Sequence, residues 1–512
     1  MNDEKKGLTR RDFLKATGGA TALAGAAAGG IFLSSSDSSA AELPKKWDEE
    51  FDVVVVGSGF AGLAAAIEAK NSGCSVTILE KMRTPGGNSI INGGIVAAAG
   101  SPLQDREGIK DTPELMYEDM LKAGLGLNHP DLAMTVAEKS NEAVQWTINY
   151  LGVQYKDRVA HLGGHSEPRS YTTYNQSGSA IVRKELDKVR SLGMNVRTQV
   201  FLSKLLTDGD GIVRGVKIHE GYIFPKADSG AVKNIKAKKA VVLATGGFGN
   251  DIIFRSIEDP RLTKDTGCTN QPGATAEGLI NALRIGATPV QLSWIQLGPW
   301  ASPDEKGLGI SPIFAVYSAF PYGVMIDPST GKRFVNELAD RKVRSDAIIK
   351  TGRISIGIAD AEGAKHSSHL MDKMLKRGSV KKFDSLEKLA AEYKINIQGL
   401  KETIAKYNQF VQEKNDRDFG KPIRNDAKQL IQPPFYAMRL WPKVHHCMGG
   451  VQINKSAQVI SLDHVPIPRL YGAGEVCGGV HGACRLGSVA VPDCLVFGRI
   501  AGKKAALERS WA

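Results

Sequence analysis

Three glycines and one acid near the start of the sequence could together hold a dinucleotide. Gly57, Gly59 and Gly62 follow the apolar run 51–56, and Glu80 ends a second apolar run. Glycines at this spacing let the backbone turn tightly and approach a pyrophosphate, and a helix that starts there presents its N-terminus to the phosphate charge. The acid would accept hydrogen bonds from ribose hydroxyls. The spacing therefore predicts a dinucleotide site.

A βαβ unit must position these residues. The apolar runs 51–56 and 75–80 predict two buried parallel strands, with a helix at 61–72 between them. The pattern further predicts helices at 112–124, 130–151, 178–191 and 385–413, and strands at 195–200, 212–219 and 237–244. The glycine motif has no second copy, so we expect no separate NAD(P) domain.

The composition narrows the class of protein. The chain has 512 residues, of which 42% are hydrophobic and 23% charged, which excludes wholesale disorder and suggests several domains. No apolar run reaches the ~18 residues that a membrane span needs. The net charge of +12 has no dominant Lys/Arg block, so an anionic small molecule or acidic partner is favoured over nucleic acid.

The character of the sequence changes near residue 297. Residues 298–323 are rich in glycine, proline and aromatic residues, and glycine-rich loops return between 444 and 496. We infer an α/β chain: a Rossmann-like FAD-binding domain in two pieces, 42–297 and 441–512, with an inserted α+β capping domain at 298–440.

The first 41 residues are predicted to be a targeting segment rather than part of the fold. Arg10 and Arg11 precede the small-residue apolar stretch 20–33, which resembles a twin-arginine export signal. The alternative is a basic amphipathic helix. An export signal of this kind implies a folded protein that reaches the periplasm, where free NAD(P)H is not available as a reductant.

Eight further segments carry a family resemblance. They are Gly86–Ser89, Gly163–Ser166, Ala244–Gly249, Pro272–Thr275, Gly331–Arg341, His445–Gly450, Tyr471–Glu475 and Gly479–Gly487. In this order they resemble the flavoprotein of the soluble fumarate reductase and flavocytochrome c family, over about residues 48–508. The resemblance implies bound FAD, a mobile cap, and a substrate held between cap and flavin.

The resemblance also implies which residues contact FAD. They are Gly57, Gly59, Phe60, Ala61, Gly62, Glu80, Gly87, Asn88, Ser89, Gly93, Gly94, Ala244, Thr245, Gly246, Gly247, Glu475 and Ser488. Membrane-bound relatives attach FAD covalently to a histidine near the Gly-Gly pair, where this chain has Asn88-Ser89, so we expect non-covalent FAD. For Glu475 the alternative is an ordinary acid in a surface loop.

The family reduces a carbon–carbon double bond conjugated to a carboxylate. Flavin gives a hydride to the β carbon, and an arginine gives a proton to the α carbon. The resemblance assigns that proton to Arg341 and the grip on the substrate carboxylate to His446 and Arg485. The alternative for Arg341 is a structural arginine paired with Asp340 or Glu337.

The sequence departs from the fumarate-specific members at the far end of the substrate. Those members have a histidine there, and a Thr-Glu-x-x-Arg segment in which Thr binds the second carboxylate and Glu and Arg relay protons. Here the aligned positions are Val316, Tyr317 and Phe320, and no histidine lies between 219 and 366. Aromatic residues gather instead, namely Trp300, Phe314, Tyr317, Phe320 and Tyr322.

An aromatic wall disfavours a second carboxylate, because a buried unpaired charge is costly. We therefore expect a monocarboxylic 2-enoate such as methacrylate or acrylate, with Tyr317 among the substrate-binding residues and as a candidate proton relay. The alternative is that these aromatic residues only pack the cap.

Taken together, these features predict a periplasmic 2-enoate reductase for anaerobic respiration. Its electrons would come from a separate multihaem cytochrome c, since the chain contains no C-x-x-C-H haem motif. Fumarate or urocanate reduction is one alternative, and a non-catalytic flavin electron-transfer subunit is another. Cys447, Cys477, Cys484 and Cys494 could be small buried residues, a disulfide or a metal site; no metal is predicted.

Overall fold

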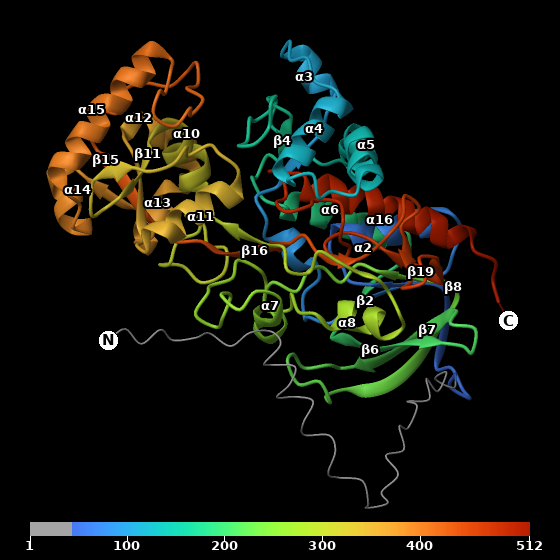
Figure 1. Cartoon of the computed structure of the whole chain (residues 1–512). Coiled ribbons are helices and arrows are strands. Elements are labelled where there is room, and N and C mark those ends of the chain that lie inside the picture. Colours follow the sequence, from blue (N-terminus) through green and yellow to red (C-terminus); the bar gives the residue numbers. More distant parts are fainter. Residues whose placement is uncertain (1–42, 512) are drawn as a thin grey trace, which may run out of the picture. The chain divides into compact units, whose positions relative to one another are not determined.

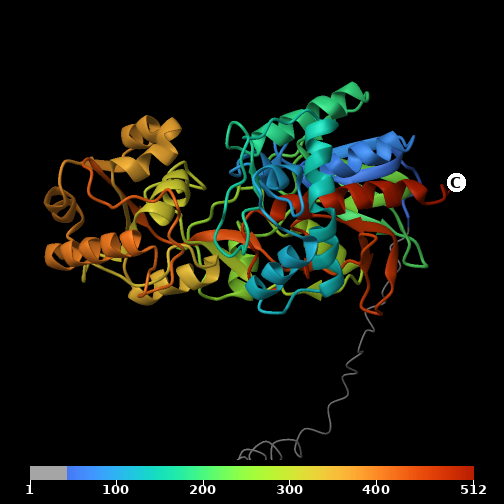
Figure 2. The same ribbon diagram turned by 90° about the horizontal axis from the view of Figure 1, so that it is seen from above.

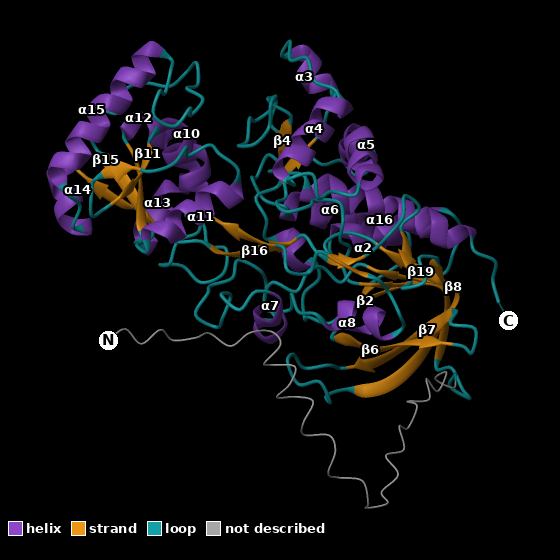
Figure 3. Ribbon diagram, in the orientation of Figure 1, coloured by secondary structure: helices purple, strands orange, loops and turns teal. Residues whose placement is uncertain are grey.

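The computed structural model describes residues 43–511. The predicted export signal at 1–41 therefore lies outside the described residues. Glu42–Ala512 form a single compact unit, so the domain boundaries at 297 and 440 stay predictions. The strands of the largest sheet come before residue 297 and after residue 440, and the strands of the second-largest sheet lie between these two boundaries (Figures 1 and 3).

The larger sheet carries the glycine motif and has the predicted parallel core. Its strand order is β18-β19-β8-β1-β2-β5, with β7 also pairing β8 and β6 pairing β7. Strand β1 runs parallel to β2 and β8, and β8 runs parallel to β19. The bounds are β1 Glu49–Val56, β2 Val76–Glu80, β5 Val196–Thr198, β6 Val200–Thr207, β7 Val213–Glu220, β8 Ala231–Leu243, β18 Gln458–Ile460 and β19 Pro466–Gly472.

Two glycines make the first βα turn possible. Gly57 has φ +108°, and a Cβ there would lie 2.1 Å from the carbonyl oxygen of Ala244. A Cβ on Gly62 would lie 2.0 Å from the carbonyl oxygen of Gly57. Only glycine permits this turn and the close approach of helix α2 (Phe60–Asn71) to the strands.

The second sheet is antiparallel and belongs to the predicted cap. Its order is β12-β11-β13-β15-β14. These strands are β11 Val324–Asp327, β12 Lys332–Arg333, β13 Ser355–Ala359, β14 Lys381–Phe383 and β15 Phe435–Leu440, accompanied by helices α11 Arg341–Thr351, α12 Ala361–Ala364 and α13 Ser368–Arg377. Figure 2 shows these yellow and orange elements gathered in a region of their own. An antiparallel sheet with separate helices is the expected α+β arrangement.

A two-stranded ribbon connects the two parts of the chain. Strand β10 (Ile295–Gly298) leads toward the cap and β16 (Lys443–Cys447) leads back, and they pair antiparallel with Gln296 opposite His446. Because neighbouring residues of a strand point to opposite faces, His445 and His446 face different surroundings.

The stretch 385–413 is helical as predicted, but it forms two helices. The structure has α14 (Leu386–Tyr393) and α15 (Ile397–Glu413). Lys394 adopts the left-handed conformation with φ +53° and ends α14. The Asn396 side chain then accepts a hydrogen bond from the Gly399 amide and caps α15. The apolar stripe continues across the break, which is why the pattern did not reveal it.

The remaining predicted elements form within a few residues of their expected bounds. The helices are α4 Pro113–Ala123, α5 Pro130–Asn149 and α6 Ser179–Ser191. The other elements are η1 Gly87–Ile90, β3 Ile95–Ala97, α3 Pro102–Arg106, β4 Ser170–Thr172, α7 Ile252–Glu258, α8 Glu277–Arg284, β9 Pro289–Val290, α9 Pro312–Phe314, η2 Ala315–Ala319, α10 Phe320–Tyr322, η3 Lys365–Ser367, β17 Gly450–Val451 and α16 Ala490–Leu507. Within residues 43–511, no helix combines the length and apolar character needed to cross a membrane.

Candidate active site

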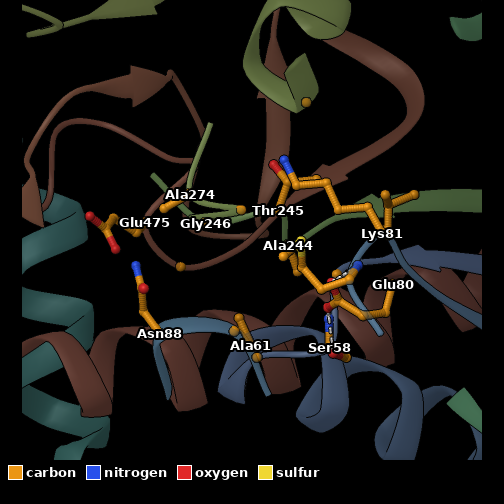
Figure 4. A pocket seen from close by; sticks show the side chains of 18 of the residues that line it. Ser58, Ala61, Glu80, Lys81, Asn88, Ala244, Thr245, Gly246, Ala274 and Glu475 are labelled. Carbon is orange, nitrogen blue, oxygen red and sulfur yellow. Dashed lines mark hydrogen bonds between the residues drawn. The ribbon is translucent and has the colours of Figure 1, made fainter. Parts of the chain in front are cut away.

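A cavity lies at the glycine motif. Residues from both predicted pieces of the FAD-binding domain line it, including Gly57–Ala61, Ala244–Gly246 and Ala473–Glu475. Figure 4 shows Glu475 and Asn88 near one end, and Ser58 and Glu80 near the other. Two distant parts of the sequence thus build one continuous wall.

Most residues predicted to contact FAD line this cavity. Those that do are Gly57, Gly59, Phe60, Ala61, Glu80, Gly87, Asn88, Ser89, Ala244, Thr245, Gly246 and Glu475. Gly62, Gly93, Gly94, Gly247 and Ser488 are not among the lining residues. Gly62 packs against the backbone of the turn at Gly57. Gly247 leaves room for the Glu475 side chain, since a Cβ there would lie 2.5 Å from Glu475 Oε1.

The acid at the end of β2 is held in place by its neighbours. Glu80 Oε2 accepts a hydrogen bond of 2.6 Å from the Ser58 hydroxyl, and Glu80 Oε1 accepts one of 2.9 Å from the Met82 amide. The carboxylate is therefore fixed at the cavity wall, where it can also accept from ribose hydroxyls.

The sequence analysis missed a charged pair on the opposite wall. Lys81 and Glu277 both line the cavity, and Lys81 Nζ lies 3.0 Å from Glu277 Oε2. Thr275 accepts a hydrogen bond from the same lysine. Thr275 belongs to a segment that carried the family resemblance, and Lys81 directly follows the predicted acid, so both positions had a signal.

These residues fit FAD. Helix α2 begins at Phe60, and its N-cap residue Gly59 has no side chain to cap it. The Phe60 amide donates to the Ser89 hydroxyl at 3.0 Å, so the amides of Ala61 and Gly62 are the first-turn N–H groups left for a pyrophosphate. The cavity has the acid Glu80 at its wall. No histidine is among the residues that line it in the described part of the chain, and non-covalent attachment stays a prediction.

A cluster of three arginines lies at the start of α11 and in the loop before α16. We call Arg341, Arg344 and Arg485 the arginine cluster. Arg344 and Arg485 are only 6% and 4% exposed, and none of the three forms an ion pair with a carboxylate within residues 43–511. Arg485 Nε is buried and has no hydrogen-bond partner. Buried cations without counter-charges are poised to bind an anion.

The electrostatics of the cluster follow from this crowding. Burial, and then the neighbouring charge of Arg485, lower the pKa of Arg341 well below its usual value. Burial lowers the pKa of Arg344 and of Arg485 to about 10. A guanidinium with a lowered pKa releases its proton more readily than an ordinary one.

The alternative of a structural Arg341 does not fit its contacts. Glu337 is held instead by Arg333, with 2.7 Å between Arg333 Nη2 and Glu337 Oε2. Asp340 caps α11 by accepting from the Val343 amide at 3.0 Å. Neither acid forms an ion pair with Arg341.

Gln296 connects Arg341 to the loop of Arg485. Arg341 Nη1 donates to Gln296 Oε1 at 2.8 Å, and Gln296 Nε2 donates to the carbonyl oxygen of Arg485 at 2.9 Å and to Cys484 Sγ at 3.1 Å. Because arginine can only donate, the amide orientation is fixed. The sequence analysis did not select Gln296, and no pattern in the sequence marked it.

The histidine that contacts the Arg485 guanidinium directly is His445. Arg485 Nη2 lies 3.2 Å from His445 Nε2, and His445 Nδ1 lies 2.8 Å from the Thr269 hydroxyl. Since the arginine donates, Nε2 is the acceptor and Nδ1 carries the proton. Burial, and then Arg341 and Arg485, lower the pKa of His445, so it stays neutral. It therefore orients Arg485 instead of donating to a carboxylate.

His446 contacts Glu475, which lines the FAD cavity. Its Nε2 is buried and has no hydrogen-bond partner among the described residues, so its predicted role at the substrate carboxylate stays a prediction. Its Nδ1 lies 3.4 Å from Glu475 Oε1, which also accepts from the Cys447 amide at 2.9 Å. Burial raises the pKa of Glu475 to about 7 and lowers that of His446. Because the imidazole of His446 is neutral, this contact is not an ion pair. Successive residues of β16 point to opposite faces, so His445 meets Arg485 and His446 meets Glu475.

The aromatic residues do not all reach the site. Trp300 lies edge-on to the His445 ring at 4.6 Å and 5.9 Å from the Arg341 guanidinium. Phe320 contacts Arg344 at 5.0 Å. Phe314 is fully buried in the apolar cluster beside them, and Tyr322 stacks on His366 in another cluster. Only part of the expected aromatic wall therefore faces the arginine cluster.

Tyr317 lies outside the contacts of the arginine cluster. It sits in the π-helical turn η2, and its buried hydroxyl has no hydrogen-bond partner among the described residues. Burial raises the pKa of Tyr317 to about 12, and the neighbouring Thr172 and Arg158 side chains offset part of this rise. No contact joins it to Arg341, so its predicted substrate role rests on the sequence alone.

All six cysteines are free thiols. Cys447, Cys477 and Cys484 are buried. No group of three or more His, Cys, Asp or Glu side chains among residues 43–511 could hold a metal ion. These observations favour the interpretation of small buried residues over a disulfide or a cluster.

The chain is similar in sequence to a known protein family and to several characterised relatives. The FAD binding domain family matches residues 52–491. The chain is 45% identical over 504 residues to the acrylate reductase flavoprotein subunit of Shewanella woodyi, covering 97% of this chain and 98% of the relative. It is 38% identical to a fumarate reductase (cytochrome) of Shewanella frigidimarina, covering 89% and 77%, and 33% identical to a urocanate reductase of Eggerthella lenta, covering 91% and 76%.

A solved structure agrees with these relatives. The open conformation of a flavocytochrome c3 fumarate reductase superposes with a TM-score of 0.72 at 31% identity, covering 99% of this chain and 82% of that chain. The fold and cavity therefore define an FAD-dependent oxidoreductase. The chain belongs to the FAD binding domain family, and within it to the flavoproteins of the soluble fumarate reductase and flavocytochrome c group.

Proposed function

We propose that this protein is a periplasmic FAD-dependent reductase of monocarboxylic 2-enoates such as acrylate and methacrylate. The observation that carries the proposal is the arginine cluster: within residues 43–511 its three guanidinium groups form no ion pair with a carboxylate, Arg344 and Arg485 are buried, and Arg341 lies beside the Trp300 ring. A small anion with an apolar end matches both features.

The chain's own residues would do the following work. Arg485, oriented by His445, donates to the substrate carboxylate through its free Nε. This contact withdraws electron density and makes the β carbon a better hydride acceptor. FAD, when bound, supplies that hydride. Arg341, with its lowered pKa and fixed by Gln296, gives the proton to the α carbon.

The far end of the site supports a single carboxylate. Val316, Tyr317 and Phe320 stand where the fumarate-specific pattern has its Thr, Glu and Arg. Arg344 donates to the backbone carbonyls of Glu337 and Asp340, and Lys342 pairs with Asp346, so both extra cations are already engaged.

A separate cytochrome donor is part of this proposal. The chain covers 98% of the acrylate reductase flavoprotein subunit but 77% of the fumarate reductase whose name includes a cytochrome. A flavoprotein subunit without its own haem needs an external donor. The export signal predicted at 1–41 supports the periplasmic location.

The test is an anaerobic assay of the purified protein with reduced viologen and a panel of enoates. We expect turnover of acrylate and methacrylate. Turnover of fumarate or urocanate alone would favour the reductases of those acids, and no turnover with any acid would favour an electron-transfer subunit. Turnover with NADH as sole donor would contradict the external cytochrome. Acid precipitation should release flavin as FAD, and flavin left in the pellet would contradict non-covalent binding.

A further inference from the structure

Arg341 needs a source of protons for every turnover. A guanidinium that has given its proton to the substrate must recover one from solvent. The positions of the Glu and Arg that relay protons in fumarate-specific members are Tyr317 and Phe320 here. Within the described residues no contact joins the Tyr317 hydroxyl to Arg341 or to Gln296, which holds Arg341. The phenyl ring of Phe320 has no exchangeable proton, so another group must serve.

The Cys484 thiol is the protic side chain at the centre of the arginine cluster. It is 2% exposed and accepts a hydrogen bond of 3.1 Å from Gln296 Nε2, the same amide that holds Arg341. Cys484 and Arg341 therefore contact the same side-chain amide. A negative charge on this sulfur would raise the pKa of Arg341, Arg344 and Arg485.

Asp340 links this thiol to the outside. Its Oδ1 lies 4.0 Å from Cys484 Sγ and accepts the N-cap hydrogen bond from the Val343 amide at 3.0 Å. The residue is partly exposed, so its carboxylate can exchange protons with water. Long contacts of this kind often shorten when a substrate closes the site.

We propose that Cys484 returns the proton to Arg341, and that Asp340 returns it to Cys484. After Arg341 gives its proton to the α carbon, the neutral guanidine takes the thiol hydrogen and becomes a cation again. The sulfur is left as a thiolate among three guanidinium groups. Asp340, protonated from solvent, then restores the thiol. The path consumes one solvent proton per substrate, and no electrons move along it.

The order of proton affinities supports this direction. A thiol is ordinarily a stronger acid than a guanidinium, and a carboxylic acid is ordinarily a stronger acid than a thiol. Each transfer toward Arg341 therefore runs downhill. The other nearby cations cannot substitute, because Arg344 donates to backbone carbonyls and Lys342 pairs with Asp346.

This inference rests on the proposed role of Arg341, and the test separates the two. Reduced holoenzyme is mixed with acrylate, and flavin reoxidation is followed in a single turnover and then in steady state with excess reduced viologen. The variants are Cys484→Ala and Asp340→Asn, because Asn still caps a helix. Cys477→Ala, which removes another buried thiol, is the matched control.

We expect Cys484→Ala and Asp340→Asn to keep the single-turnover rate within about twofold, because the first proton is already on Arg341. Their steady-state rate should fall by about tenfold or more, and Cys477→Ala should match the wild type. An unchanged steady-state rate in either variant would overturn the path. A single-turnover rate that falls equally would show that Cys484 only positions Gln296, and would also overturn it. Failure of wild-type enzyme to reoxidise with any enoate would instead reject the proposed function.

Discussion

The FAD cavity and the arginine cluster handle charge in opposite ways. In the cavity each acid or base already has a protein partner, as Lys81 has Glu277 and Glu80 has the Ser58 hydroxyl. In the cluster three guanidinium groups share no carboxylate within residues 43–511. The cavity is therefore complete as a shape made by backbone and glycines, whereas the cluster is electrostatically incomplete until an anion binds.

The largest effect should come from Arg341→Lys. A lysine cannot reproduce the planar donor that Gln296 holds, so we expect kcat to fall about 10²–10⁴-fold. The flavin content should stay unchanged, because Arg341 does not line the cavity. Steady-state rates and flavin absorbance measure the two quantities.

Lys342→Arg is the control for this change, since Lys342 pairs with Asp346 on the exposed side of α11. A near-wild-type kcat in the Arg341→Lys variant would show that the proton comes from another group.

Gly57→Ala should instead prevent FAD from binding in the cavity. The added Cβ would meet the Ala244 carbonyl oxygen at 2.1 Å, and the left-handed backbone alone costs about 1–3 kcal/mol. We expect loss of FAD and a lower Tm. Gly73→Ala is the matched control, because Gly73 also has positive φ but nothing lies within 4 Å of the added Cβ. Equal loss of FAD in both variants would mean that strain, and not the turn, decides binding.

The two adjacent histidines offer a direct test of the comparison. His445→Ala frees Arg485, and a hydrogen bond to a charged group is worth about 1.5–3 kcal/mol, so KM for the enoate should rise about tenfold or more with FAD retained. His446→Ala removes the contact with Glu475, so it should weaken FAD binding more than substrate binding. Titration with FAD and KM measurements check both. The opposite pattern would support His446 as the partner of the substrate.

Substrate preference measures how apolar the far end is. Each CH₂ that packs there contributes about 0.8 kcal/mol, and a carboxylate without partners loses about 1–3 kcal/mol. We expect kcat/KM for methacrylate or acrylate to exceed that for fumarate by about tenfold to a hundredfold. A specificity constant that favours fumarate would show that Arg344 turns toward the substrate.

The smallest effect concerns a buried acid outside both sites. Glu185 on α6 is fully buried, and both carboxylate oxygens lack hydrogen-bond partners. Burial raises its pKa well above the usual value, so the folded protein binds a proton that the unfolded chain releases. Stability should therefore fall as pH rises above the pKa of the unfolded chain, by about 1.4 kcal/mol per pH unit.

Glu185→Gln removes this dependence and should raise Tm more at pH 8 than at pH 5. Glu138→Gln, which changes an exposed acid, should leave the pH profile unchanged. The same slope in the wild type and in Glu185→Gln would show that Glu185 stays ionised.

The FAD-binding unit could be predicted from sequence because its determinants are local. Gly57, Gly59, Gly62 and Glu80 act through backbone geometry that follows directly from residue type and spacing. The helix break at Lys394 was missed because the apolar stripe does not stop there. Lys81 was missed because its partner Glu277 lies almost two hundred residues away.

The arginine cluster was predictable in composition but not in contacts. Arg341 and Arg485 carry motifs, and both lie where an anion could bind. The choice between His445 and His446 depends on which face of β16 meets the ribbon strand β10, and that depends on a register shift between Gln296 and Leu297. Gln296 itself acts only through tertiary contacts, so no local pattern identifies it.

The side-chain amide of Gln296 forms hydrogen bonds with two residues that are far apart in the sequence. Arg341 lies in the first turn of α11, and Arg485 lies just before α16. The proposed proton donor thus belongs to the predicted cap, and the cavity that fits FAD is lined by residues from the two flanking pieces. The residues that would bind the redox cofactor and the residue proposed as the acid therefore lie in different segments of the sequence. Changes within the inserted segment can retune the choice of acid and substrate while the cofactor wall is inherited intact.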